Sequence, residues 1–501
     1  VGTLTVTGNA TFNALSELVI EKDIALADQL NVAGNVTVNT GSSLSVVSAS
    51  GYQGVYLDSF TAIQSAALTG VFDTVNQEAD YFVTPTYTAT DLSFVVDSLL
   101  NNWTGAGVDD LWSTAANWSN GVPGLGHDTF INGVFTVDYD AGTNTILTLT
   151  TSSGSLLSLL GGSLTVDGLT NIGGSFSISN STFSVNSDMS ALAMSLSDAT
   201  LDGNNANLTV SNPVSTSGIT NIINWSSIDA PQLQVTGTST LNNINSFAPL
   251  TIDVTAATDS LVLLNSQLTS NNTAAVTGAG TIDLQTGTDW AINRLTPLVM
   301  PVAMTLDLNG GNLTNVEDLT FPGTVNANQP QFLQNGPMVI PSTTTFNYFS
   351  DTSIANSFDV INNGLFVIQP AVASVNLAST GGAVFVNNGS VEIGSTKTLV
   401  VQSELQNNGS FTGNGTLAVN GGVLDFLTAT VLPSTMNFEL NSGNILNAQN
   451  LTVAGIFNWV NGTIDATSGS FTTSGLANVN NGVLNTTWNA NGSTTISGLL
   501  S

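Results

Sequence analysis

One type of turn returns at intervals of about twenty residues, and this spacing limits the possible folds more than any other feature of the chain. Gly389 and Gly409 each follow two asparagines, and their residue numbers differ by 20. Gly462 and Gly482 each follow an asparagine and show the same difference. Asparagine and glycine tolerate the left-handed backbone of tight corners. Hairpins favour Asn-Gly turns too, but they predict turns roughly every 8–12 residues. The spacing therefore favours the coil of a parallel β-helix with three short strands.

The segments between the turns alternate like half-buried strands. A motif of the form Leu-x-Val-x-Gly places its leucine and valine on one face of an extended chain. It begins at Leu4, Leu30, Leu164, Leu233 and Leu451. In a stack of coils, such apolar residues point inward, and asparagines at equivalent corners hydrogen-bond to one another. We predict an all-β chain that folds as a right-handed parallel β-helix, or β-solenoid, with a small β closing block. An array of β-sandwiches is the alternative.

Two blocks interrupt the pattern and divide the chain into four regions. Residues 51–100 are the most aromatic stretch, and residues 81–96 have the pattern of two strands joined by a turn. Pro85 disfavours a central strand there. Tryptophans mark the second block, at residues 101–133. We expect the following regions: terminal solenoid coils over 1–50, an aromatic-rich β closing block over 51–100, a tryptophan-rich opening or cap module over 101–133, and the main solenoid over 134–501.

Three tryptophans, Trp103, Trp112 and Trp118, lie close together in the second block. Such a cluster can stack on sugars, or it can cover the open apolar end of a solenoid. We favour the covering role, because a large apolar side chain closes an otherwise open core.

A longer pattern runs through the same block. Its members are Trp103, Gly105, Trp112, Ser113, Ala115, Asn117, Trp118, Pro123 and Asp128. The pattern resembles the opening module of autotransporter-type and adhesin-like β-helix surface proteins of bacteria. Residues 3–98 resemble the closing module of these proteins, and residues 451–464 resemble their coil repeat. The resemblance implies a secreted, cell-surface protein whose structural cap is formed by Trp103, Trp112, Asn117, Trp118, Pro123 and Asp128. Such motifs specify architecture better than function.

The charge distribution leaves little material for catalysis. Lys22, Arg294 and Lys397 are the only basic residues, and the net charge is −31. Such a chain repels nucleic acid and anionic lipid, and no segment has the apolar length of a membrane helix. We therefore expect neither nucleic-acid binding nor membrane insertion. The chain has no cysteine, which excludes disulfides and thiolate metal sites. His127 is the only histidine, and we expect it to make a capping hydrogen bond. We predict that the protein is not an enzyme.

Paired carboxylates are the remaining candidates for chemistry. Asp109–Asp110 and Glu317–Asp318 are adjacent pairs, and adjacent residues of a strand point to opposite faces. Asp138 and Asp140 would share a face, so they form a candidate calcium site with help from carbonyl oxygens. We expect no other cofactor.

These observations favour an extracellular structural protein: a surface stalk, an adhesin or a fibre subunit. Its expected partners are further copies of itself and cell-surface glycans. The alternative is a carbohydrate-binding or carbohydrate-processing parallel β-helix. Carboxylates clustered midway along one face of the solenoid would favour that alternative.

The two ends of the sequence both have the pattern of a coil interrupted midway, so we expect them to meet in a subunit joint. The expected joint residues are Val1, Leu4, Val6, Ile496, Leu499 and Leu500. The joint is either a head-to-tail contact in a homopolymer or a covalent link in a longer tandem-repeat protein.

Overall fold

The computed structural model describes residues 1–49, 51–78, 80–247, 249, 251–270, 274–293, 297–315, 319–333, 336–351, 354–356, 358–379 and 381–501. The chain is nearly all β, with 63% strand and 1% helix, and forms a β-solenoid of about 17 turns with parallel sheets. This confirms the predicted fold class over the alternative of β-sandwiches. The chain divides into two compact units, which we describe separately. The first unit is Val1–Ser195 with Ala199–Thr209, and the second is Leu196–Asp198 with Val210–Ser501.

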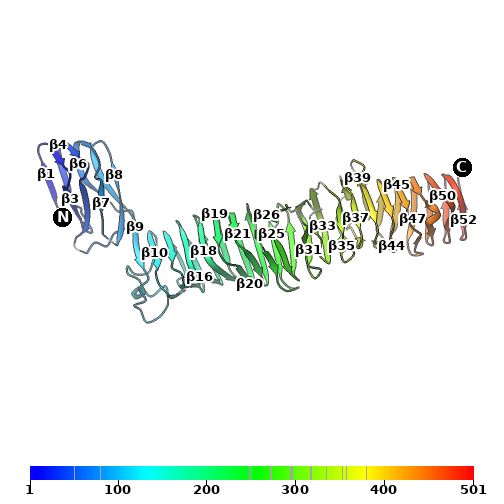
Figure 1. Ribbon diagram of the computed structural model, residues 1–501, viewed down its shortest axis with the longest axis horizontal. Helices are drawn as coiled ribbons and strands as arrows, with labels where there is room; N and C mark the ends of the chain where they lie inside the picture. Colours follow the sequence, from blue (N-terminus) through cyan, green and yellow to red (C-terminus); the bar gives the residue numbers. More distant parts are fainter. Residues whose placement is uncertain are drawn as a thin grey trace. The chain divides into compact units, whose positions relative to one another are not determined.

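The first unit begins with a short stack of coils (Figure 1). Its strands are β1 (Thr3–Val6), β2 (Ala10–Phe12), β3 (Glu17–Lys22), β4 (Gln29–Val38), β5 (Ser43–Ser48), β6 (Ser59–Thr69) and β7 (Thr74–Asn76). The long strand β4 pairs in parallel with β1 and β2 on one side and with β6 on the other. Strands β3, β5 and β7 form a second parallel sheet. The solenoid therefore continues beyond residue 50, as far as Asn76.

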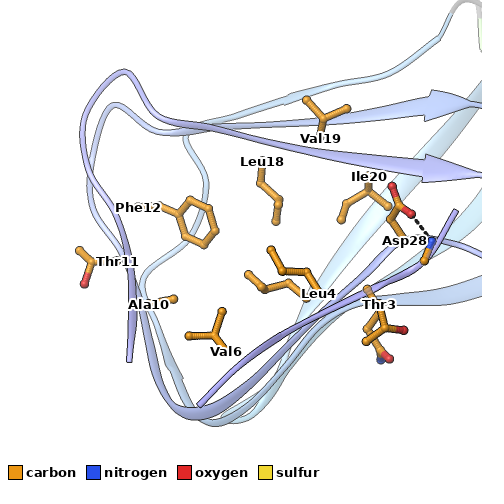
Figure 2. A pocket seen from close by; sticks show the side chains of 13 residues that line it. Thr3, Leu4, Val6, Ala10, Thr11, Phe12, Leu18, Val19, Ile20 and Asp28 are labelled. Carbon is orange, nitrogen blue, oxygen red and sulfur yellow. Dashed lines mark hydrogen bonds between the residues drawn. The ribbon is translucent and has the colours of Figure 1, made fainter. Parts of the chain in front are cut away.

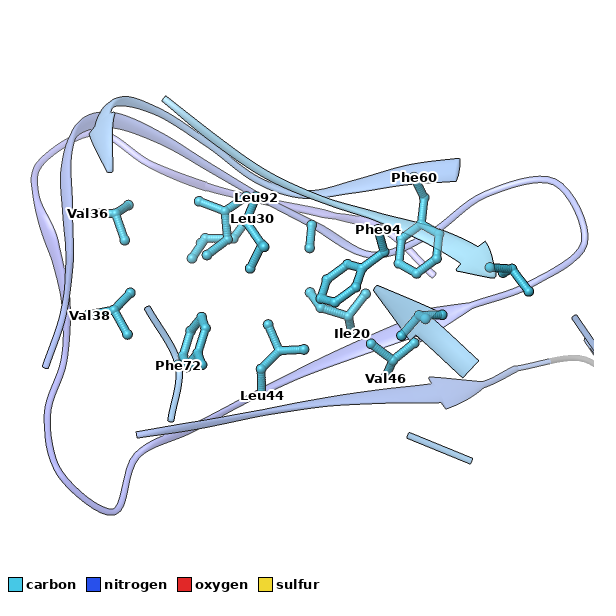
Figure 3. Packing of buried hydrophobic residues seen from close by; sticks show 14 of the residues in the cluster. Ile20, Leu30, Val36, Val38, Leu44, Val46, Phe60, Phe72, Leu92 and Phe94 are labelled. Carbon is cyan, nitrogen blue, oxygen red and sulfur yellow. The ribbon is translucent and has the colours of Figure 1, made fainter. Parts of the chain in front are cut away.

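Alternation builds the core of this stack. Figure 3 shows side chains from both sheets, such as Ile20, Val36 and Leu44, meeting between them. All three are buried, whereas their neighbours in sequence are more exposed. Phe60 and Phe94 stack with their ring centroids 5.4 Å apart. The apolar period of two thus becomes a continuous interior.

Two antiparallel strands end the first stack, β8 (Tyr81–Tyr87) and β9 (Asp91–Asn102). They are the two strands expected over residues 81–96. Among the described residues β8 pairs with β9 alone, so Pro85 lies in an edge strand, where its missing N–H is tolerated. Strand β9 is also antiparallel to β6 but parallel to β10 (His127–Ile131), the first strand of the next stack. The direction of the strands therefore reverses at β9.

The second stack of this unit has three strands per coil. After the 3₁₀ turn η1 (Ala115–Asn117) and β10, the elements are β11 (Thr136–Tyr139), β12 (Thr143–Ile146), β13 (Thr148–Thr151), β14 (Leu156–Leu159), β15 (Gly162–Val166), β16 (Thr170–Ser179), β17 (Ser181–Val185), β18 (Met189–Ser197) and β19 (Thr200–Val210). Strand β10 pairs with β13, β11 with β14, and β12 with β15, and in each pair the residue numbers of the partners differ by 20. The predicted coil length is thus confirmed here.

The second unit repeats this arrangement with coils of variable length. Leu365 pairs with Ser390, a difference of 25 in residue number, whereas Ala477 pairs with Thr494, a difference of 17. Its elements are β20 (Val214–Ser217), β21 (Ile219–Asp229), β22 (Gln232–Val235), β23 (Thr238–Ile244), β24 (Thr251–Val254), β25 (Ser260–Leu264), β26 (Gln267–Ser270), β27 (Ala275–Gly278), β28 (Thr281–Gln285), β29 (Asp289–Ile292), β30 (Leu298–Val299), β31 (Thr305–Thr314), β32 (Leu319–Thr320), β33 (Thr324–Leu333), β34 (Met338–Ile340), β35 (Thr345–Tyr348), β36 (Ile354–Asn356), β37 (Val360–Asn362), β38 (Leu365–Ile368), β39 (Ser374–Ser379), β40 (Val384–Asn387), β41 (Ser390–Ile393), β42 (Thr398–Val401), β43 (Glu404–Asn407), β44 (Ser410–Gly413), β45 (Thr416–Phe426), β46 (Thr430–Leu432), β47 (Asn437–Leu446), η3 (Ala448–Asn450), β48 (Leu451–Val453), β49 (Ile456–Trp459), β50 (Thr463–Thr473), β51 (Ala477–Val479), β52 (Val483–Ala490) and β53 (Thr494–Ile496).

Asparagine ladders run along the corners of the second unit, as the sequence predicts. Asn362 Nδ2 donates to Asn387 Oδ1 at 2.9 Å, and Asn387 Nδ2 donates to Asn407 Oδ1 at 2.7 Å. All three side chains are buried. The glycine of the same corner has a different role from the expected one. The backbone of Gly389 is not left-handed, but a Cβ atom there would collide with the carbonyl oxygen of Gly364 in the preceding coil. Glycine is needed at this corner for close approach of the coils.

Candidate functional site

The three clustered tryptophans form one apolar group beside the first strands of the second stack, β10 and β11. The rings of Trp103 and Trp118 lie edge to face with centroids 4.9 Å apart, and those of Trp112 and Trp118 are 4.7 Å apart. Trp112 also contacts Tyr139 of β11 at 5.4 Å. All three indoles are buried. Stacking on a sugar requires an exposed ring face, so this arrangement agrees with the covering role and not with a sugar platform.

Polar groups hold the tryptophan-rich module in place. Asn117 is buried and uses both ends of its amide: Nδ2 donates to the carbonyl oxygens of Asp109 and Leu111, and Oδ1 accepts from the Gly107 N–H. Such complete pairing is what a buried amide needs to be stable. Asp109, a member of one predicted carboxylate pair, accepts from Asn117 and Thr114 and so belongs to this framework.

The remaining expected cap residues, Pro123 and Asp128, connect the module to strands that follow it in the second stack. The Pro123 carbonyl accepts a hydrogen bond from Asn144 Nδ2 at 2.5 Å, and Asp128 Oδ1 accepts from Thr148 Oγ1 at 2.7 Å. His127 Nδ1 accepts a hydrogen bond from the Gly124 N–H at 2.7 Å, which closes the turn before β10. Burial lowers the pKa of His127. The single histidine therefore makes a capping contact, as expected.

The candidate calcium ligands Asp138 and Asp140 point outward from either side of the buried Tyr139. Asp140 is already engaged: its two oxygens accept from the Ser113 N–H at 2.9 Å and from Ser113 Oγ at 2.6 Å. Within the described ranges, no group of three or more His, Cys, Asp or Glu side chains is placed to hold a metal ion. The second predicted adjacent pair, Glu317–Asp318, lies outside the described residues.

A pair of carboxylates on neighbouring coils was not predicted from the sequence. Asp283 of β28 is in register with Asp307 of β31, so both side chains lie on one outer face. Burial raises the pKa of Asp307, and the nearby Asp283 carboxylate adds to this rise while a hydrogen bond from Asn326 opposes it. Asn309 and Gln285 donate to Asp283. Coils of unequal length hide this register in the sequence.

A buried polar cluster in the first stack was also missed. Lys22 Nζ lies 3.0 Å from Asp58 Oδ2, and the same oxygen accepts a hydrogen bond from the Tyr52 hydroxyl at 2.9 Å. The lysine is only 3% exposed, and its ammonium lies 4.5 Å from the centre of the Tyr52 ring. Burial raises the pKa of Tyr52, and the hydrogen bond to Asp58 adds to the rise. The alternation of Leu18, Ile20 and Lys22 points the lysine inward, and this was the available signal.

An open hollow with a volume of about 610 Å³ lies at the end of the first coil. Figure 2 shows Leu4 and Val6 of β1, Phe12 of β2, and Leu18 of β3 pointing into it. Leu4 is 67% exposed, although its partner in the next coil, Leu30, is buried. Val1 is also an expected joint residue, but it does not line the hollow. Its ammonium group lies 3.8 Å from Glu21 and 3.8 Å from Asp28.

The other expected joint residues belong to the last coil of the second unit. Ile496 of β53 is 54% exposed and Leu499 is 75% exposed, whereas Leu500 is half-buried through its bridge to Gly482. The apolar row of Leu440, Trp459 and Val479 is buried, and it ends in Ile496. The two ends therefore present the same feature: interior residues of a coil with only one neighbouring coil.

The comparisons with known proteins assign no relative. Neither a family model, a curated protein nor a solved structure matches the chain. Across the described residues, no helix has the length and apolar character that crossing a membrane would need.

Proposed function

We propose that this chain is an extracellular structural protein of a bacterial surface, acting as a stalk, adhesin or fibre subunit. The observation that carries the proposal is the buried cluster of Trp103, Trp112 and Trp118 at the start of the second stack. These residues carry the resemblance to bacterial β-helix surface proteins. Coils that contact only their neighbours suit a spacer whose length grows with the number of repeats.

The test of the proposal is antibody labelling of the bacterium that encodes the chain. Antibodies raised against the folded protein are expected to label intact cells as strongly as permeabilised cells. Labelling that appears only after permeabilisation would place the protein inside the cell and overturn the proposal.

Carbohydrate binding is the second candidate function, and one groove favours it. This groove of about 400 Å³ lies on the outer face of β47, β49, β51 and β53. Its polar lining residues are Glu439, Asn441, Asn458, Asn478, Asn480, Thr495 and Ser497. Amides and a carboxylate match the alternating donors and acceptors of sugar hydroxyls. Calorimetry with a panel of surface polysaccharides would detect binding, and Asn458→Ala should weaken it; Asn388→Ala, in another exposed amide ladder, is the control.

Carbohydrate processing would use the pair Asp283 and Asp307, since glycosidases use two carboxylates, one of them with a raised pKa. Neither described hollow includes this pair. Release of reducing sugar that Asp307→Asn abolishes would establish this activity in place of the purely structural role.

A further inference from the structure

We infer that the open end of the first coil is a seat for the C-terminal coil of another copy of this sequence. The inference rests on the proposed structural role and names the partner that extends the solenoid. It concerns two surfaces of this chain, and it is the same whether the second copy is a separate chain or part of the same polypeptide.

The seat offers both apolar surface and unused backbone groups. Leu4, Val6, Phe12 and Leu18 line the hollow at the end of the first coil. Among the described residues β1 and β2 pair only with β4, and β3 pairs only with β5. Each of these strands therefore has one edge without a strand partner. An exposed edge beside an apolar core is a template for a further strand.

The C-terminal coil offers the complementary surface. In the described part of the chain β50 is the one strand that pairs with β52, and β51 is the one strand that pairs with β53. The first half of β52 is already covered, since the Leu484 N–H donates to Ser501, so its second half is the free edge. Aromatic rings of successive coils contact one another in the order Phe438, Phe457, Phe471 and Trp488. Trp488 is the last ring of this row, and its centroid lies 6.3 Å from that of Phe471. No Asp, Glu, Lys or Arg lies between residues 477 and 501, so this coil does not repel the acidic residues near the seat, Glu17 and Glu21.

One spacing brings the two surfaces into register. Within the last coil, Ser470 pairs with Thr487, Thr473 with Ala490 and Ala477 with Thr494, and in each pair the residue numbers differ by 17. The strands at the two ends share one internal step: Ala10 follows Thr3 by seven residues, and Thr494 follows Thr487 by seven residues. This shared step lets Thr3–Val6 pair with residues 487–490 while Ala10–Phe12 pairs with Thr494–Ile496. Strand β1 thus falls on the second half of β52, and β2 falls on β53.

The two faces of each strand also agree at this spacing. In this register Leu4 lies beside Trp488, Val6 beside Ala490 and Phe12 beside Ile496. Each of these six residues pairs with a buried residue of the neighbouring coil in its own stack, so each is at an inward-facing position. Thr5 falls on Asn489 and Thr11 on Thr495, and these four side chains are exposed. A shift by one residue would place inward residues on outward ones in both strands. The same register therefore aligns β1 with β52 and β2 with β53, which favours the C-terminal coil of another copy as the partner that binds this end.

The contact joins two different surfaces, so it does not close on itself. Each copy would keep a free seat at one end and a free last coil at the other. Such a heterologous contact propagates into a fibre.

Disulfide trapping tests the register directly, because the chain has no cysteine of its own. Thr5→Cys is mixed with Asn489→Cys, and Thr11→Cys with Thr495→Cys, as the two matched pairs. Thr5→Cys mixed with Thr495→Cys is the mismatched control, since its two sites lie on different strands. Neighbouring strands bring Cα atoms within the roughly 4.4–6.8 Å that a disulfide spans. We expect mixed dimers from both matched pairs and only background from the mismatched pair; equal yields would overturn the inference.

Sedimentation velocity over a range of concentrations tests the association itself. We expect the 501-residue chain to form larger species as its concentration rises. Leu4→Asp should weaken association on the order of a hundredfold or more, because it places a carboxylate in the apolar joint. Leu4 is 67% exposed, so this variant keeps the fold of its own chain. Val134→Asp is the control, since Val134 is 83% exposed and lies outside the joint.

The outcomes separate the joint from the proposed function. A chain that stays monomeric at all concentrations, with labelled intact cells, overturns the joint and leaves the surface role in place. Matched disulfides in a protein that is found only inside cells support the joint and overturn the surface role.

Discussion

The Asn387 amide nitrogen lies 2.7 Å from the Asn407 side-chain oxygen one coil further along, and both side chains are wholly buried. Asn387 also accepts from Asn362, so it is the middle of a chain of amides. Each amide satisfies the next, and none can be removed without leaving partners unpaired in the interior.

Replacing the middle amide should therefore destabilise its coil. Asn387→Ala leaves a donor of Asn362 and an acceptor of Asn407 without partners, at an expected cost of roughly 2–5 kcal/mol. Hydrogen exchange of strands β37, β40 and β43 measures the local loss of stability. Asn388→Ala, in the exposed ladder one residue away, should cost no more than about 0.5 kcal/mol. Equal exchange in the two variants would show that burial of the ladder has no energetic importance.

The tryptophan cluster should carry much of the stability at the start of the second stack. Trp112→Ala is expected to cost about 3–5 kcal/mol, because it opens a cavity between Trp118 and Tyr139. Protease cleavage within residues 103–126 should rise accordingly.

A conservative variant separates packing from hydrogen bonding at this position. Among the described residues Trp112 Nε1 has no hydrogen-bond partner, so Trp112→Phe should retain most of the stability. Val108→Ala, at an exposed site of the same module, should leave cleavage unchanged. Rapid cleavage of Trp112→Phe, as fast as that of Trp112→Ala, would argue against ring packing as the cause.

His127 should titrate below the ordinary histidine value of 6.5. Burial disfavours the imidazolium and is the largest cause of the lowered pKa, whereas the backbone hydrogen bond with Gly124 and the Asp128 carboxylate oppose the shift. Because the folded pKa is lowered, this group's contribution to stability is complete above pH 6.5 and is lost as the pH falls through the folded pKa. The ring signals of the only histidine in a proton NMR titration measure this directly. A midpoint at or above 6.5 would contradict the buried, accepting imidazole.

Replacing one partner of the Lys22–Asp58 ion pair should destabilise the protein more than replacing both. Asp58→Ala leaves an ammonium group unpaired in a site that is 3% exposed, and we expect a loss on the order of 3 kcal/mol. The double variant Lys22→Met with Asp58→Asn removes both charges and keeps an acceptor for the Tyr52 hydroxyl, so it should recover much of that loss. Near-ultraviolet circular dichroism of the tyrosines follows the unfolding of this unit. A double variant less stable than Asp58→Ala would mean that the charges themselves stabilise the stack.

Much of the fold follows from local rules of sequence. Leu164 and Val166 alternate as strand residues do, and the recurrence of glycine at 389 and 409 predicts the coil length. Alternation does not encode strand direction, however. Leu92, Phe94 and Val96 have the same pattern as a solenoid strand, yet β9 is antiparallel to β6. For the same reason, the coil formed by β6 and β7 could not be separated in advance from the closing block.

The contacts that depend on register were harder to predict. The buried pair of Lys22 and Asp58 joins a strand to an irregular segment far along the sequence, and no periodicity links the two. Asp283 and Asp307 are in register on neighbouring coils, but the coil spacing in the second unit varies, so their alignment could not be counted from the sequence. The burial of the three tryptophans could be predicted from the sequence, because exposing such large apolar side chains to water is unfavourable.

Strand β9 has a consequence for the order in which the chain folds. It completes the first stack through β6 and β8, and it also provides the first edge on which β10 is laid down. In a chain that emerges N-terminus first, the earlier coils therefore lack this last edge until about residue 102 is free. Once it is in place, β9 offers its free edge to β10, the first strand of the second stack. Completion of the first stack and the start of the second thus depend on the same strand.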